Sequence, residues 1–227
     1  MPVRALSDPV TRIVIINPNS TASMTTAMVA VAQAAVPNLD FVGWTSRLGP
    51  PSIQGAEDGE AAKTPLLDLV RTAAAEGAGG IIIGCFDDTG LGEAAQLAQC
   101  PVIGIGQAAY HFAALRQWRF SVVTTLAVSV PIIEGNIRAI GFGAHLGKVR
   151  ASDAAVLELE SDPEASARKI LAQADCAEQE DGIDAIILGC AGMVQVTHAV
   201  RQRATVAVID PVACAARCID WLVQDRP

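Results

Sequence analysis

Short, continuous runs of apolar residues alternate along the chain with longer stretches in which apolar positions recur at helical spacing. Such runs are typical of parallel strands covered on both faces, and the periodic stretches are typical of the covering helices. The pattern therefore predicts an α/β protein. The expected strands are residues 13–16, 41–44, 81–83, 102–105, 120–123, 148–151, 185–188 and 206–209. The expected helices are residues 20–36, 62–76, 106–117, 130–140, 163–180 and 211–223.

The second set of four strands resembles the first. The segment GIIIGCFDD (80–88) is similar to AIILGCAGM (185–193), an offset of 190 − 85 = 105, and the next expected strand of each set keeps that offset. The first strands, RIVIIN (12–17) and RFSVVT (119–124), align at 119 − 12 = 107. Three similar elements in the same order indicate an internal duplication. We therefore predict two pseudo-symmetric halves, residues 1–115 and 116–227, each with a four-stranded parallel sheet and with the functional site in the cleft between them.

Composition and charge exclude several classes of partner. Hydrophobic residues make up 51% of the 227 residues, and the net charge of −8 accompanies an isoelectric point near 4.8. An acidic chain without a basic cluster argues against binding to nucleic acid or to an anionic membrane. The apolar runs are too short to span a bilayer, and the N-terminal residues lack the apolar core of a signal peptide. We therefore expect a cytoplasmic protein with a small-molecule partner.

Two cysteines, Cys85 and Cys190, have positions that suggest chemistry. Disulfide frameworks belong mainly to small secreted chains, so the six cysteines of this chain are expected to be free thiols. Both of these residues end an apolar strand directly after a glycine. Ligands of open parallel sheets bind beyond the carboxyl ends of the strands, and helices that begin there favour the thiolate. The two thiols should therefore face one cleft from opposite sides, unless they are buried residues retained by the duplication.

Two weak acid–base groups on opposite sides of one carbon atom can invert a stereocentre. One thiolate removes the proton from one face, and the opposite thiol returns a proton to the other face. The resulting carbanion needs a neighbouring carbonyl group, whose oxygen is stabilised by backbone N–H groups and polar side chains. Polar side chains at the other strand ends could supply this contact, namely those of Asn17, Ser46, Thr124 and Thr125. These residues predict proton transfer with Cys85 and Cys190 as the catalytic pair.

Four segments resemble, in the expected order, the Asp/Glu/hydantoin racemase superfamily and, within it, the hydantoin racemase group. They are INPNSTASMT (16–25), CFDDTGL (85–91), RFSVVTTL (119–126) and LGCAGM (188–193). The resemblance implies an Asp/Glu racemase-like fold and favours a homo-oligomer. It also implies a racemase that needs no cofactor and no metal and that inverts C5 of a cyclic ureide, a 5-monosubstituted hydantoin. Allantoin racemases share nearly all of these motifs, so the side chain of the substrate stays open.

The resemblance also implies roles for residues beside the two thiols. Phe86 could form an apolar wall for a ring substituent. Asp87 or Asp88 could orient a ring N–H, although either carboxylate could equally cap a helix. Beyond the second thiol, Ala191 and Gly192 are expected to border the substrate.

Two places depart from the pattern of the group. Thr89 stands where a proline usually follows the acidic pair. The segment SIQGAED (52–58) carries Ala56 and Glu57 where a histidine and an aromatic residue are more usual, and it is expected to border the pocket. The change in the SIQGAED segment leaves the identity of the substrate open, but it does not affect the predicted two-thiol chemistry.

Other signals in the chain are weaker. GIGQAA (104–109) fits the loose dinucleotide pattern GxGxxA, but its strand is not the first of its unit and no acidic residue lies near position 125, so a close helix–strand turn is favoured. Cys214 and Cys218 have the i, i+4 spacing of a helix without further ligands nearby, and they are expected to be core thiols.

Competing functions remain for the same scaffold. Amino-acid racemisation, decarboxylation or cis–trans isomerisation would need groups that bind a free carboxylate, and the predicted cleft has only Arg47 nearby. A non-catalytic sensor of small molecules would bind its ligand without any proton exchange, and the presence of both thiols argues against it.

Overall fold

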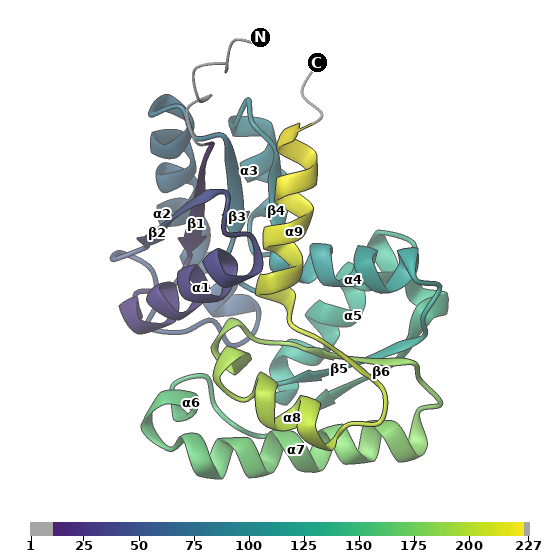
Figure 1. Ribbon diagram of the computed structural model, residues 1–227. Helices are drawn as coiled ribbons and strands as arrows, with labels where there is room; N and C mark the ends of the chain where they lie inside the picture. Colours follow the sequence, from purple (N-terminus) through teal and green to yellow (C-terminus); the bar gives the residue numbers. More distant parts are fainter. Residues whose placement is uncertain (1–10, 225–227) are drawn as a thin grey trace, which may run out of the picture.

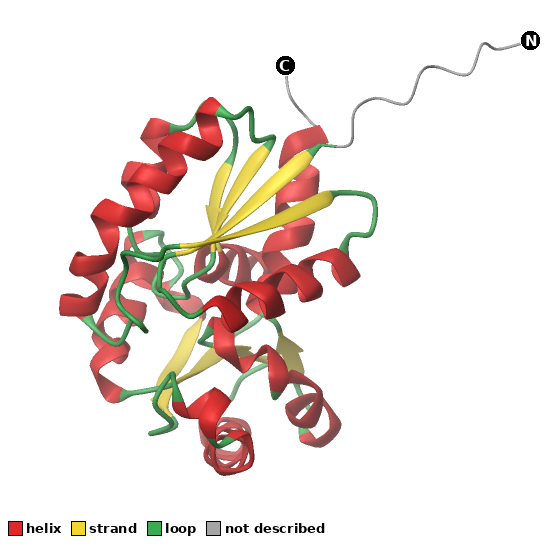
Figure 2. Ribbon diagram, turned by 90° about the vertical axis from the view of Figure 1, so that its left-hand side faces the viewer, coloured by secondary structure: helices red, strands yellow, loops and turns green. Residues whose placement is uncertain are grey.

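The computed structural model describes residues 11–224, which form two four-stranded sheets with helices on their faces (Figure 1). Most of the N-terminal segment inspected above for a signal peptide lies outside these residues. Figure 2 shows the two sheets at opposite ends of the molecule, with helices packed around and between them. Within residues 11–224, no helix combines the length and the apolar composition needed to cross a membrane.

Both sheets are entirely parallel and have the same strand order, β2–β1–β3–β4 and β6–β5–β7–β8. The predicted α/β fold of two four-stranded parallel sheets is therefore confirmed, and each predicted strand overlaps an observed one. The first sheet contains β1 (Arg12–Asn17), β2 (Asp40–Thr45), β3 (Gly80–Ile83) and β4 (Val102–Gly104). The second sheet contains β5 (Phe120–Thr124), β6 (Leu146–Ala151), β7 (Ala185–Leu188) and β8 (Ala207–Ile209).

The six predicted helices are present and several short ones were not predicted. The predicted ones are α1 (Ala22–Ala35), α2 (Ala56–Ala75), α4 (Ile105–Leu115), α5 (Val130–Ala139), α7 (Pro163–Glu180) and α9 (Pro211–Gln224). The short ones are α3 (Leu91–Leu97), α6 (Glu158–Ser161), α8 (Thr197–Arg203) and the 3₁₀ turns η1 (Ala127–Ser129), η2 (Gly143–His145) and η3 (Ala191–Gln195). Segments of three to seven residues are too short to display a helical period, which is why the apolar pattern did not reveal them.

Helix α2 begins six residues earlier than predicted, at Ala56 rather than at residue 62. The chain turns into the helix at Gly55, whose φ of 95° lies in the region that favours glycine. Asp58 then accepts a hydrogen bond from the backbone N–H of Gln54 at 2.9 Å, and Glu57 lies beside it in the first turn. Acidic side chains stabilise the amino end of a helix, so this polar turn is helical although it carries no apolar stripe.

The main core cluster joins the two sheets. It contains Ile15 of β1, Tyr110 of α4, Phe120 of β5 and Ile219 of α9, all fully buried. The last helix, α9, packs against α1, α4, β3 and β4, so the end of the chain covers the first sheet (Figure 1). Cys214 and Cys218 of α9 lie in or against this cluster, as predicted for core thiols. The division of the chain near residue 115 stays a prediction.

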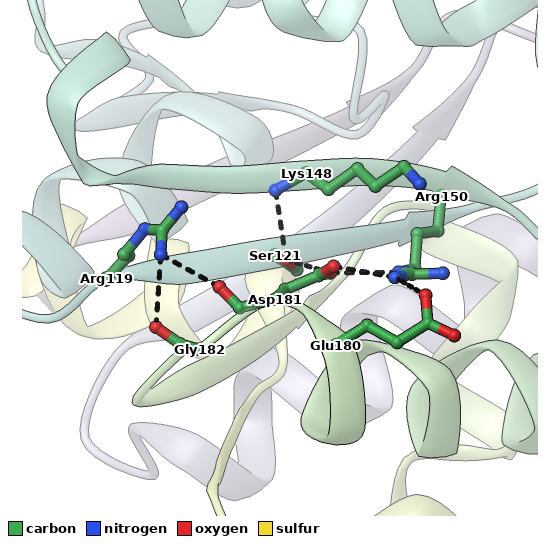
Figure 3. Close-up of polar contacts among 7 residues, drawn as sticks. All are labelled: Arg119, Ser121, Lys148, Arg150, Glu180, Asp181 and Gly182. Atoms are coloured by element: carbon green, nitrogen blue, oxygen red, sulfur yellow. Dashed lines mark hydrogen bonds and ion pairs between the residues drawn. The ribbon is translucent and has the colours of Figure 1, made fainter.

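A buried ion pair fixes the second sheet to the end of α7 (Figure 3). Arg150 of β6 and Asp181, which follows α7, have side chains that are 8% and 6% exposed, and their closest N–O distance is 2.6 Å. Asp181 also accepts a hydrogen bond from the Ser121 hydroxyl of β5 at 2.7 Å. Because buried charges are tolerated when they are paired and hydrogen-bonded, this network holds β5, β6 and α7 in one arrangement.

Candidate active site

The two predicted catalytic cysteines follow equivalent strands of the two sheets. In each half, the glycine before the cysteine donates its N–H across the sheet, Gly84 to Ile16 O and Gly189 to Val123 O, both at 2.8 Å. A Cβ atom at Gly84 would lie 2.7 Å from Met28, and one at Gly189 would lie 2.7 Å from Val122. Both glycines therefore allow close packing at the strand end, most strictly at Gly189, where the neighbour is the branched Val122 side chain; at Gly84 it is the flexible end of Met28.

Cys85 and Cys190 line the same small cavity between the two sheets. Its volume is about 30 Å³, close to that of one water molecule in the liquid. Five of the predicted substrate-binding residues also line it, namely Phe86, Asp87, Thr124, Thr125 and Ala191. Among the residues that the structure describes, no group of three His, Cys, Asp or Glu side chains is placed to hold a metal ion.

Burial sets the protonation of both thiols. It raises the pKa of the Cys190 thiol to about 11. The backbone N–H groups of Gly192 and Met193 favour the thiolate and lower this pKa, but by less than burial raises it. Burial raises the pKa of the Cys85 thiol still further, and the nearby carboxyl of Asp87 adds to the rise. The expectation that the strand ends would favour the thiolate was wrong in its net effect, because desolvation outweighs the backbone donors.

Asp87 contributes an unpaired carboxyl oxygen to the cavity wall. Burial raises the pKa of Asp87 to about 7, although a hydrogen bond with the Ser129 side chain lowers it. Its Oδ2 atom is buried and has no hydrogen-bond partner among the described residues. Asn136 of α5 donates to the Asp87 carbonyl at 2.8 Å, so the second half of the chain holds this loop of the first half.

Asp88 has a different role from its neighbour. Its Oδ1 atom accepts a hydrogen bond from the Gly106 N–H at 3.1 Å, and its carboxyl also receives the N–H of Gln107, at the amino end of α4. A Cβ atom at Gly104 would overlap the Asp88 carboxyl, and one at Gly106 would overlap the Phe86 carbonyl. The glycines of the GIGQAA segment therefore make room for a carboxylate of the same chain. Asp88 caps α4, and Asp87 is the acidic residue that faces the cavity.

The comparison with known proteins agrees with this geometry. The Asp/Glu/hydantoin racemase family matches residues 13–219. This chain belongs to that family. A hydantoin racemase from Rhizobium meliloti is 42% identical over 92% of this chain and 87% of its own length. An allantoin racemase from Klebsiella pneumoniae has a TM-score of 0.89 and 36% identity over 94% of this chain and 88% of its own. A second allantoin racemase, from Pseudomonas fluorescens, has the same TM-score and identity, over 94% and 91%.

A more distant structure shows only the fold of this racemase family. The glutamate racemase from Francisella tularensis has a TM-score of 0.69 with 15% identity over 94% of this chain and 81% of its own. The predicted family and fold are thus confirmed, and no residue role follows from these similarities.

Three predicted substrate-binding residues of this racemase-family chain lie behind the cavity wall. Asn17 is fully buried and donates to Asn19 Oδ1 at 2.9 Å and to Thr25 Oγ1 at 3.1 Å. Ser46 is buried, and its N–H donates to the Asn17 carbonyl at 2.9 Å. Gly192 supports the Cys190 thiol through its N–H. Asn17 and Gly192 contact cavity-lining neighbours and Ser46 contacts Asn17, but none of the three lines the cavity itself.

Seven cavity-lining residues are not among the predicted site residues, namely Asn19, Met24, Ile53, Gly84, Ser129, Val156 and Gly189. Asn19 and Met24 lie within the INPNSTASMT segment, whose polar character could have indicated the first of them. Ile53 belongs to the SIQGAED segment, which was expected to border the pocket and does so. Val156 lies in a loop of the other half, and nothing in the local pattern marks it. Gln54 connects these loops, because its Oε1 atom accepts the N–H of Val156 at 2.9 Å.

Proposed function

We propose that this chain inverts the C5 stereocentre of 5-monosubstituted hydantoins by proton transfer between two thiols, without a cofactor. The observation that carries the proposal is the cavity wall shared by Cys85 and Cys190, which follow equivalent strands of duplicated sheets. The 42% identity with a hydantoin racemase supports the choice of substrate class.

In the proposed reaction, the thiolate of one cysteine removes the C5 proton and the thiol of the other delivers a proton to the opposite face. The electron pair left on C5 moves into the adjacent carbonyl group of the ring, so an enolate oxygen forms during the reaction. The side chains of Thr124 and Thr125 line the cavity where this oxygen could be stabilised. The unpaired Oδ2 of Asp87 is available to accept the N–H of a cyclic ureide.

The test is to replace each thiol singly, as Cys85→Ser and Cys190→Ser, and to follow optical rotation and C5 deuterium exchange of a resolved hydantoin. Because each variant loses one of its two acid–base groups, racemisation should fall by about 10²- to 10⁴-fold. Each variant should still exchange the C5 proton of one enantiomer, the one that faces the remaining thiol. Cys176→Ser, in α7, is the matched control and should racemise like the wild type. Full racemisation by either single variant would contradict the two-thiol mechanism.

Allantoin is the second candidate substrate. It is a hydantoin with a ureido group at C5, and two allantoin racemases are the structural relatives with a TM-score of 0.89. A panel of alkyl and aryl hydantoins, allantoin, aspartate, glutamate and maleate would separate the activities of the superfamily. Turnover of allantoin alone would assign the chain to the second candidate, and turnover of a free carboxylic acid alone would contradict both. The homo-oligomer and the cytoplasmic location stay predictions.

A further inference from the structure

Thr89 lies between the Cys85 thiol and a second, larger hollow of the molecule. Its hydroxyl donates a hydrogen bond to Cys85 Sγ, with an O–S distance of 3.6 Å. On its other side, Thr89 lines a hollow of about 390 Å³, together with Gly59, Glu60, Lys63 and Asn136. Glu60 is exposed, so this hollow adjoins solvent. Thr89 therefore contacts the partly exposed Cys85 and also lines this hollow, and the residue itself is only 8% exposed.

Gly59 of α2 leaves the space in front of this hydroxyl open. A Cβ atom built at Gly59 would lie 3.9 Å from Thr89 Oγ1. Apart from the adjacent residues and turns of α2 itself, no other atom of the described chain would lie within 4 Å of it. Any larger side chain at position 59 would therefore stand between the Thr89 hydroxyl and the hollow. The hydroxyl faces Cys85 on one side and water-accessible space on the other.

The proposed reaction requires protons to enter and leave Cys85. Burial raises the pKa of both thiols, so formation of a thiolate requires a group that takes up its proton. Each turnover also leaves the two thiols with exchanged protonation states, which must be restored before the same enantiomer can react again. The hydrogen-bond partners described for Cys190 are backbone N–H groups, which cannot accept a proton. A hydroxyl both donates and accepts hydrogen bonds, so Thr89 differs from them in kind.

We propose that the Thr89 hydroxyl passes protons between the Cys85 thiol and water in the hollow beside Gly59. As the S–H bond of Cys85 breaks, its proton binds Thr89 Oγ1, and the original hydroxyl proton of Thr89 moves to a water molecule. The electron pair stays on sulfur, nothing is oxidised or reduced, and the reverse sequence reprotonates Cys85. The inference rests on the proposed function, and Thr89 acts through Cys85 without contacting the substrate.

Kinetics separate this relay from a purely structural role. The step that returns the two thiols of the free enzyme to their starting protonation states can limit kcat. It does not enter kcat/KM, because kcat/KM covers only the steps from substrate encounter to product release. Gly59→Leu, which blocks the water side and leaves every thiol contact in place, should therefore lower kcat by roughly tenfold with kcat/KM unchanged. Thr89→Val, which keeps the shape but removes the hydroxyl, should lower kcat at least as much. Thr89→Ser should restore most of the lost rate.

Gly135→Leu is the matched control, because Gly135 is an exposed glycine of α5 where an added Cβ meets no atom within 4 Å. It should keep the kcat of the wild type, and the urea midpoints of all variants verify folding. A wild-type kcat in Thr89→Val would overturn the relay but not the proposed function. A loss of kcat in Thr89→Val that Gly59→Leu does not share would do the same. A wild-type protein that racemises nothing in the panel would instead overturn the proposed function, and the relay with it.

Discussion

At the scale of single residues, the requirements of folding and of the proposed reaction diverge most at Asp87. An unpaired carboxyl oxygen in a buried wall contributes nothing to stability, and burial raises the pKa of Asp87 to about 7. A residue that breaks a packing rule without local compensation is typical of a functional site.

Asp87→Asn should stabilise the fold in a pH-dependent way. The pKa of Asp87 is higher in the folded chain than in the unfolded chain, where it is about 4. The folded state therefore loses stability relative to the variant as pH rises from about 4 to about 7, and the difference is constant at higher pH. A difference of about 1–3 kcal/mol in the free energy of unfolding is expected at pH 8.

Urea unfolding at several pH values measures this effect. Asp40→Asn, at an exposed position, serves as the control and should show little pH-dependent difference from the wild type. An Asp87→Asn variant that is less stable than the wild type at pH 8 would show that the carboxylate is stabilised by its surroundings.

At the scale of elements, the duplicated strand–glycine–cysteine units are followed by different structures. Cys190 leads directly into the 3₁₀ turn η3, whose N–H groups reach its thiol. Cys85 leads into a loop that places Asp87 at the cavity, turns Asp88 toward α4 and brings Thr89 back to the thiol. Asp88 takes a left-handed conformation, with φ of 49°. The loop is held in this conformation because the Asp88 carboxyl accepts a hydrogen bond from the Gly106 N–H at the amino end of α4.

Gly106→Ala should displace this loop. The added Cβ would overlap the Phe86 carbonyl and approach the Asp88 carboxyl, so backbone must move. A loss of about 1–3 kcal/mol in the free energy of unfolding is expected, together with slower racemisation because Phe86 and Asp87 shift in the cavity wall. Urea unfolding and optical rotation measure the two effects.

The matched control is Gly135→Ala in α5, where the added Cβ meets nothing within 4 Å. Replacing a helical glycine with alanine at such a site should stabilise by up to about 1 kcal/mol. Equal stabilities of the Gly106→Ala variant and the wild type would mean that the loop tolerates displacement.

At the scale of the whole molecule, the cavity is closed by contacts that cross between the two halves. Gln54 accepts the N–H of Val156 at 2.9 Å, and Ser23 donates to Glu160 Oε1 at 2.6 Å. Ile53 and Val156, beside the first of these contacts, line the cavity. The space beside the thiols is about 30 Å³ in this conformation, so separation of these loops would widen the entry for a five-membered ring.

Gln54→Ala should make this separation easier. A hydrogen bond of this kind contributes about 0.5–1.5 kcal/mol, so the open form should become about 2- to 10-fold more populated. Alkylation of Cys85 and Cys190 by iodoacetamide, followed by mass spectrometry, reports the open population because these partly exposed thiols are reached more readily when the loops separate. Gln96→Ala, at an exposed position of α3, should alkylate like the wild type. Unchanged alkylation in Gln54→Ala would mean that other contacts hold the loops.

The sequence alone determined the strands, their repetition in two sheets and the positions of Cys85 and Cys190 after equivalent strands. The boundary between the halves and the catalytic role of the two thiols stay predictions. Continuous apolar runs and their repetition are local properties, and the end of a parallel strand has a predictable place in an α/β protein. Only the tertiary structure decided that Asp87 and not Asp88 faces the cavity, that Asn17 and Ser46 lie behind its wall, and that burial raises the pKa of both thiols. These outcomes depend on how loops from distant parts of the chain meet, and on desolvation from every side of a group, which no local pattern records.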